Sequence, residues 1–134
     1  MIDMDINIDL SQFNDFEKKM QKLPSEFRAA VVHEITQTTA QSILKNTQKN
    51  TPVDTGTLRR GWRTEINDIP NGYEIEISNS VEYAPYVEYG HRARGGKSFV
   101  KGQYPLTNAM LDARATAHKV AIRAVNKFFK KAGF

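Results

Sequence analysis

Apolar and polar residues alternate in two short stretches in the middle of the chain, and this period of two is typical of β-strands with one buried face. The stretches are residues 62–67 and 73–78, with inward positions at Trp62, Thr64, Ile66, Tyr73, Ile75 and Ile77. The connection 68–72 ends in Asn-Gly, the strongest short-range hairpin signal because both residues tolerate a positive φ. The pattern therefore predicts an antiparallel hairpin.

Before the hairpin, apolar residues recur at spacings of three and four, which predicts two helices. The first would start near an N-cap at Ser11, with apolar positions at Phe13, Phe16, Met20 and Leu23. Pro24 breaks it, and Ser25 can cap the second helix, which reaches about Lys49. The apolar stripe of the second helix is Phe27, Val31, Ile35 and Ile43.

After the hairpin, the longest helix is predicted over residues 106–130. Its apolar stripe is Leu106, Met110, Ala113, Ala117, Val120, Ala124 and Phe128. Small alanines on a stripe imply that another element packs close against it. At the N-terminus, residues 2–8 alternate Ile or Met with Asp or Asn, which fits either a strand or a free arm.

These elements predict an α+β fold, with a small antiparallel sheet around the hairpin packed against long N-terminal and C-terminal helices. The 134 residues are enough for one domain, so we expect a single domain over residues 1–134. No apolar run approaches the ~20 residues that cross a bilayer, and the acidic start differs from a signal peptide. The chain contains no cysteine, which excludes disulfides and thiolate metal sites.

Charge is distributed unevenly along the chain. Residues 1–50 have a net charge of −1 (six basic, seven acidic), residues 51–90 of −4 (three basic, seven acidic) and residues 91–134 of +9 (ten basic, one acidic). An acidic middle and a basic end suggest either contact with nucleic acid or opposite faces that meet between neighbouring copies.

Residues 90–103 combine glycines and basic side chains without periodicity, which predicts a mobile basic loop. Its basic residues are Arg92, Arg94, Lys97 and Lys101. Further basic residues step along the last helix by five, four, four and three positions, on the side we assign opposite its apolar stripe. These are Arg114, Lys119, Arg123, Lys127 and Lys130. They form either the solvated face of an amphipathic helix or a surface that contacts DNA phosphates without sequence specificity.

The segment 51–62, TPVDTGTLRRGW, carries strict backbone requirements. Pro52 prevents the preceding helix from continuing, Asp54 or Thr55 can cap a new turn, and Gly56 permits a tight backbone. Leu58 and Trp62 are natural core anchors, which leaves Arg59 and Arg60 exposed. The segment is interpreted as a helix-to-strand junction; the alternative is that the two arginines contact a partner or DNA.

The segment 83–90, YAPYVEYG, contains Tyr83, Tyr86 and Tyr89 beside Glu88. A tyrosine can bury its ring and keep its hydroxyl bonded, so one interpretation is a packed turn with Glu88 tied to a backbone or basic group. The alternative is an intersubunit contact, where tyrosines are over-represented.

Together the two segments resemble the tail-component family of long-tailed double-stranded DNA phages and prophages. The residues that carry the likeness are Pro52, Val53, Asp54, Thr55, Gly56, Leu58, Trp62, Tyr83, Ala84, Tyr86, Val87, Glu88, Tyr89 and Gly90. The likeness runs from about Lys45 to Ala109, with a weaker third piece at residues 104–109. This chain departs from relatives in its basic insertion after Gly90 and in Asn108, where a proline is common.

The resemblance implies a structural virion protein that completes the tail or joins it to the head at the neck. By the same likeness it would form a homo-oligomeric ring of six copies around the DNA passage. Its partners would be the tail tube or tail terminator protein and the head connector proteins, with no cofactor and no membrane. It would reside in the virion, and in the host cytoplasm before assembly. A small basic non-specific DNA-binding protein is the alternative.

The residues do not indicate an enzyme. His33-Glu34 resembles the start of a zinc-protease motif, but Gln37 occupies the position of its second histidine. The chain has no Gly-x-Ser-x-Gly, no phosphate-binding glycine loop and no cysteine nucleophile.

Overall fold

The computed structural model describes residues 14–70 and 72–133. Its elements, in chain order, are α1 (Asn14–Lys22), α2 (Ser25–Asn50), α3 (Thr57–Arg60), β1 (Trp62–Ile69), β2 (Gly72–Asn79), α4 (Ala84–Tyr89), β3 (Gly90–Arg92), β4 (Phe99–Lys101) and α5 (Pro105–Lys131). The alternating residues 2–8, the Ser11 cap and Phe13 lie outside the described residues.

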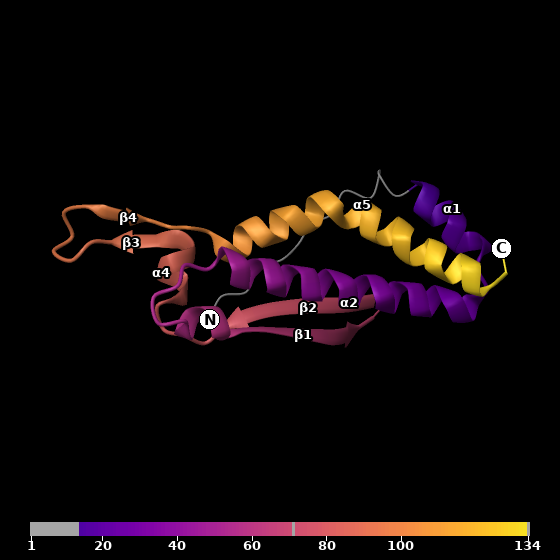
Figure 1. The fold of residues 1–134 in the computed structure, drawn as a ribbon, viewed down its shortest axis with the longest axis horizontal. Helices are drawn as coiled ribbons and strands as arrows, with labels where there is room; N and C mark the ends of the chain where they lie inside the picture. The colour runs from indigo at the N-terminus through magenta and orange to yellow at the C-terminus, as the bar shows by residue number, and fades with distance from the viewer. Residues whose placement is uncertain (1–13, 71, 134) are drawn as a thin grey trace.

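The molecule is elongated, with the two long helices α2 and α5 side by side along its length (Figure 1). The β1–β2 hairpin packs against α2, and α1 folds back onto the C-terminal part of α5. The β3–β4 hairpin extends from the end opposite the C-terminus. The predicted α+β class and the packing of a hairpin against long helices are confirmed.

The β1–β2 hairpin is antiparallel and pairs Trp62 with Asn79 at its open end and Ile69 with Gly72 at the turn. The strands are therefore slightly longer at the turn than the alternation predicted. Thr64 lies opposite Ile77 and Ile66 opposite Ile75 on one face. That face is turned toward the helices at its open end, where Trp62 and Ile77 are buried, and becomes half-exposed toward the turn.

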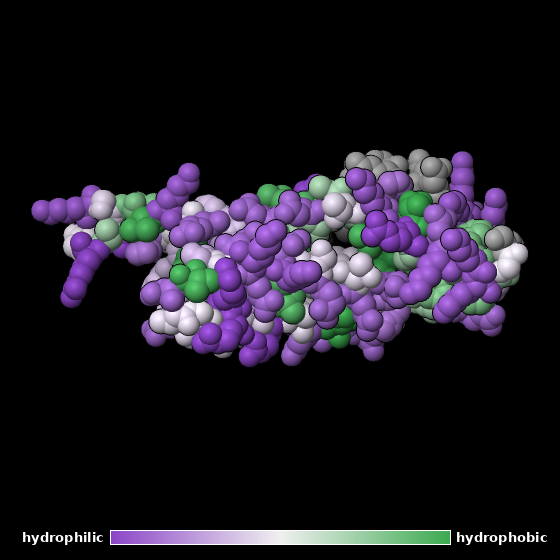
Figure 2. Space-filling model, viewed as in Figure 1, coloured by the Kyte–Doolittle hydropathy of each residue, from purple (hydrophilic) through white to green (hydrophobic). Residues whose placement is uncertain are grey.

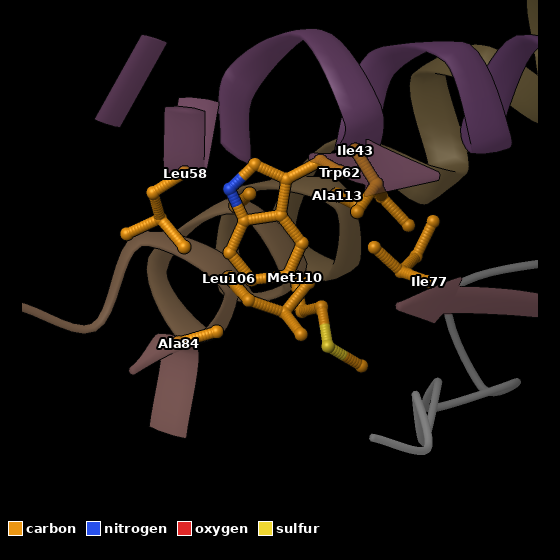
Figure 3. Close-up of a cluster of buried hydrophobic side chains, with 9 residues drawn as sticks. Ile43, Leu58, Trp62, Ile77, Ala84, Leu106, Met110 and Ala113 are labelled. Atoms are coloured by element: carbon orange, nitrogen blue, oxygen red, sulfur yellow. The ribbon is translucent and has the colours of Figure 1, made fainter. Parts of the chain in front are cut away.

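The core consists of two clusters. One surrounds Trp62 and joins α2, α3, α4, α5 and the hairpin; its buried members are Ile43, Leu58, Trp62, Ile77, Ala84, Leu106, Ala109, Met110 and Ala113 (Figure 3). The other joins α1, α2 and the end of α5 through Leu23, Val31, Ala124, Val125 and Phe128. The first cluster is where the segments of the sequence motifs meet.

The stripe predicted for α5 is buried, apart from Val120, which is only partly covered. Ala109, Ala121 and Val125 are buried as well. The buried alanines allow α2 to approach α5 closely, because a methyl group occupies little space between the two helices.

The N-cap of helix α2 lies one residue earlier than predicted. Its N-cap is Pro24, Ser25 is its first helical residue, and no side chain caps the helix. The side chain of Arg28, in α2, caps the end of the preceding helix α1. Its guanidinium donates to the carbonyl oxygens of Leu23 (2.9 Å) and Gln21 (3.1 Å). A cation at the C-terminal end of α1 satisfies carbonyl groups that have no partner within the helix.

Candidate functional site

The segment after α2 is a helix-to-strand junction, as predicted. Gly56 adopts the left-handed conformation (φ 85°) and is the N-cap of the single turn α3. Neither Asp54 nor Thr55 caps that turn in the usual way, although the Thr57 N–H lies 3.4 Å from the Thr55 hydroxyl. The turn ends at Gly61, whose N–H donates to the Leu58 carbonyl oxygen, and both Leu58 and Trp62 are buried in the core.

Trp62 is 2% exposed and lies in a cluster of apolar side chains from α2, α3, β2, α4 and α5 (Figure 3). Its indole N–H donates to the Thr51 hydroxyl (2.8 Å), which donates to the Thr47 carbonyl oxygen (2.6 Å). Both threonines are buried, so a hydrogen-bonded chain links the start of β1 to the last turn of α2.

Arg59 and Arg60 are both exposed, as predicted. Arg59 also has a structural role, because its guanidinium donates to the Thr51 carbonyl oxygen (3.0 Å) at the end of α2. Contact of either arginine with a partner or DNA stays a prediction.

The two sequence motifs meet in space. Residues of both line one hollow of about 170 Å³: Pro52, Val53, Asp54, Thr55, Gly56, Leu58, Tyr83 and Val87. Val53 is 55% exposed at this hollow. No local sequence pattern indicates that residues thirty positions apart share a surface, so this meeting of the two motifs is visible only in the structure.

Glu88 is fully buried and caps the last helix. Its carboxylate accepts hydrogen bonds from the N–H groups of Leu106 (2.9 Å) and Thr107 (3.0 Å) and from the Thr107 hydroxyl (2.7 Å). The N-terminus of a helix has unpaired N–H groups and a partial positive charge, so a carboxylate there is favourable. The prediction that Glu88 is tied to a backbone group is confirmed.

The tyrosines of the second motif are not packed as predicted. Residues 84–89 form the short helix α4, which buries Ala84 and Glu88 and leaves Tyr83, Tyr86 and Tyr89 exposed by 43%, 55% and 46%. Residues three apart lie on one side of a helix, and α4 turns its opposite side, with Ala84 and Glu88, toward the core. The Tyr86 ring lies against the His91 ring of β3 (centroids 5.5 Å apart).

Residues 90–101, predicted as a loop, form a second antiparallel hairpin. β3 and β4 pair Gly90 with Lys101 and Arg92 with Phe99. At the base of this hairpin, two glycines lie in close contact with other parts of the chain. A side chain at Gly90 would clash with Phe99 and Val100, and one at Gly102 would clash with the backbone of Glu88 and Tyr89. Each of these strands has only three residues, too few for a visible period, so the sequence pattern does not predict them.

The basic residues do not form one continuous surface. Arg92, Arg94, Lys97 and Lys101 are exposed on the β3–β4 hairpin, whereas Lys127 and Lys130 lie near the other end of the molecule. On α5, Lys119, Arg123, Lys127 and Lys130 share one side and border an open groove of about 710 Å³. Arg114 is five residues before Lys119, a rotation of about 140° around the helix, so it lies on another side.

One of these α5 side chains has an ionic partner: the Lys127 ammonium lies 3.1 Å from the Glu34 carboxylate. Among the described residues, no group of three or more metal-ligating side chains comes together. Within the same residues, no helix is both long enough and apolar enough to cross a membrane.

The structure is thus a small α+β domain, in which the motif residues form part of the core and line one surface hollow. A family model described as "Bacteriophage HK97-gp10, putative tail-component" matches residues 14–90. Because the match covers more than half of the chain, the protein belongs to this family and is a structural component of phage tails. Searches of curated proteins and of solved structures gave no match.

The match begins at α1 and ends at Gly90, so it includes both main motifs. The β3–β4 hairpin, α5 and the third piece at residues 104–109 lie beyond it. A tail component is part of the virion, and its family is structural.

Proposed function

We propose that this protein completes the tail at its head-proximal end and joins it to the head. Six copies form a ring around the DNA passage, which binds the tail tube or terminator protein on one side and the head connector on the other. The work is done by protein–protein binding and requires no chemistry. Membership of a phage tail-component family supports this proposal.

The observation that carries it is the set of exposed tyrosines at one end of the molecule. Tyr83, Tyr86 and Tyr89 are anchored on α4 by buried Ala84 and Glu88, yet each keeps more than two fifths of its surface accessible. Rigidly held, exposed aromatic side chains are typical of interfaces, where tyrosines often contribute much of the binding energy.

Replacing Tyr86 and Tyr89 by serine is expected to weaken association with copies or tail partners. At about 2 kcal/mol for an interface aromatic, each change lowers affinity roughly 30-fold. A phage or prophage that lacks the gene, complemented with the variant, should release separate heads and tails with few infectious particles. Plaque counts and electron microscopy of the lysate measure this.

Leu111→Ser is the matched control, because Leu111 is a similarly exposed apolar residue (54%) on α5. It should complement like the unchanged protein. If the gene deletion itself still yields joined, infectious particles, the proposed function is wrong. If the tyrosine variant complements fully, α4 is not the contact surface.

The second candidate function is non-specific DNA binding. It is favoured by the ridge of Lys119, Arg123, Lys127 and Lys130 along the α5 groove. We predict that Lys119→Ala with Arg123→Ala lowers retention of DNA on filters at low salt. Each lost phosphate contact should also reduce the slope of log K against log salt by about one.

Lys45→Ala with Lys49→Ala removes the same charge from exposed positions of α2 and is the control. It should leave both retention and slope nearly unchanged. If the unchanged protein is not retained at low salt, DNA binding is ruled out as its function.

A further inference from the structure

The β3–β4 hairpin, residues 90–101, is a projecting arm with an unusual surface. It extends beyond the helices, and apolar side chains lie between long basic ones along it (Figures 1 and 2). Phe99 is 64% exposed and Val100 45%. Apolar side chains held out on a projecting element, with no core beneath them, indicate a surface that is covered in the assembled state.

The register assigns the side chains of the arm to two faces. Arg92 lies opposite Phe99, and Lys101 follows Phe99 by two residues, so these three share one face. The Phe99 ring lies over Gly90, which has no side chain to displace it. This face therefore presents an aromatic ring between two cations.

The outer face of the β1–β2 hairpin has the opposite character. Trp62, Thr64 and their partners face the helices, so the alternate positions face outward. Glu65 lies directly opposite Glu76, and Glu74 is two residues nearer the turn. Arg63 is on the same face at the open end, where its guanidinium donates to the carbonyl oxygens of Arg60 (2.7 Å) and Trp62 (3.0 Å). Within the described residues, no basic side chain forms an ion pair with these three carboxylates. Like charges directly opposite each other in a sheet are destabilising unless a cation neutralises them.

The two surfaces are complementary in an apolar residue as well as in charge. Ile69 is on the same outward face, at the turn, and is 46% exposed. The hairpin thus offers an apolar contact beside carboxylates, where the arm offers an aromatic ring beside cations. In one molecule the arm points away from the hairpin (Figure 1), so this complementarity can be satisfied only between molecules.

We propose that the arm of one copy lies on the outer face of the β1–β2 hairpin of a second copy. The proposal rests on the ring assembly proposed above and names the surfaces that form it. The arm and the hairpin are different patches of one chain, so the contact is heterologous and leaves a free arm and a free hairpin at either end of a pair. Repeating such a contact closes a ring when the rotation per copy permits it. Opposite charges give the contact its register and its partner choice.

A charge-exchange experiment tests this contact. Arg92→Glu with Lys101→Glu reverses the charge of the arm. Glu65→Lys with Glu76→Lys reverses the charge of the β1–β2 hairpin. All four positions are at the surface or only partly covered, so circular dichroism should show folded proteins. Each reversal alone should weaken self-association about tenfold or more in sedimentation and light scattering at low salt. The chain that carries all four substitutions should regain association to within about threefold of the unchanged protein, since opposite charges face each other again.

Lys45→Glu with Lys49→Glu is the matched control, an equal charge change on exposed α2. If the unchanged protein assembles and the arm reversal affects it no more than this control does, the arm contact is wrong and the ring proposal stands. If the arm reversal leaves self-association intact but blocks joining of tails to heads, the arm binds another virion protein, which also overturns the inference. If the unchanged protein stays monomeric at every concentration and with tail proteins, the ring and the arm contact both fail.

Discussion

Replacing Trp62 by alanine is expected to lower the free energy of unfolding by about 3–5 kcal/mol, the usual range for truncating a buried tryptophan. The indole is 2% exposed and fills the space between α2, α5 and the hairpin (Figure 3). Its loss leaves a cavity and removes the hydrogen bond that Thr51 accepts from it. Unfolding in urea, followed by circular dichroism, measures the change.

Trp62→Phe separates the contribution of packing from that of the hydrogen bond. The phenyl ring keeps much of the volume but cannot donate to the Thr51 hydroxyl, so a smaller loss of about 1–2 kcal/mol is expected. A Trp62→Ala protein with an unchanged unfolding midpoint would contradict this picture. It would mean that the residue contributes at a contact between molecules instead of in the core.

Removing the Glu88 carboxylate is expected to destabilise the protein by about 2–4 kcal/mol and to loosen the start of α5. In Glu88→Ala, the N–H groups of Leu106 and Thr107 lose their acceptor in a buried place, and such unpaired groups each cost about 1–3 kcal/mol. In Glu88→Gln, the amide keeps one acceptor oxygen, but its NH₂ group faces a donor. The amide therefore cannot replace the carboxylate at this helix end.

Hydrogen exchange at the amides of Leu106 and Thr107 gives the specific readout, because both should exchange faster in either Glu88 variant. Glu82→Gln is the control: Glu82 is exposed nearby, and its replacement should change stability by less than about 0.5 kcal/mol. Unaltered protection of the two amides in Glu88→Ala would show that the carboxylate does not hold this helix end.

Local chemistry predicted some features because each depends on residues close together in the chain. The β1–β2 hairpin follows from alternation around Asn-Gly, and the long helix α5 follows from apolar spacings of three and four. Leu58 and Trp62 were identified as core anchors from residue type alone. The pattern of tyrosines around Glu88 predicts that its carboxylate is tied to a backbone or basic group, and the backbone alternative is the one observed.

Other features depended on contacts that no local pattern contains. Residues 90–101 have the composition of a loop, and they form a hairpin only because Gly90 and Gly102 let its base pack against α4. Arg114 is a different case, because five positions along a helix rotate a side chain by about 140°, so helix geometry alone separates it from the later basic residues. The tyrosine segment was expected to be a packed turn, and α4 exposes its rings.

The sequence by itself determined the class of fold, the family and the uneven charge, because each of these is a property of residue types and their spacing. The tertiary structure decided which surfaces those residues form. It brought the two motifs to one hollow, buried Glu88 at the start of α5, and placed the arm and the acidic hairpin where they cannot meet within one molecule. These outcomes depend on how α2, α4 and α5 pack, and packing is set by contacts between residues far apart in the chain.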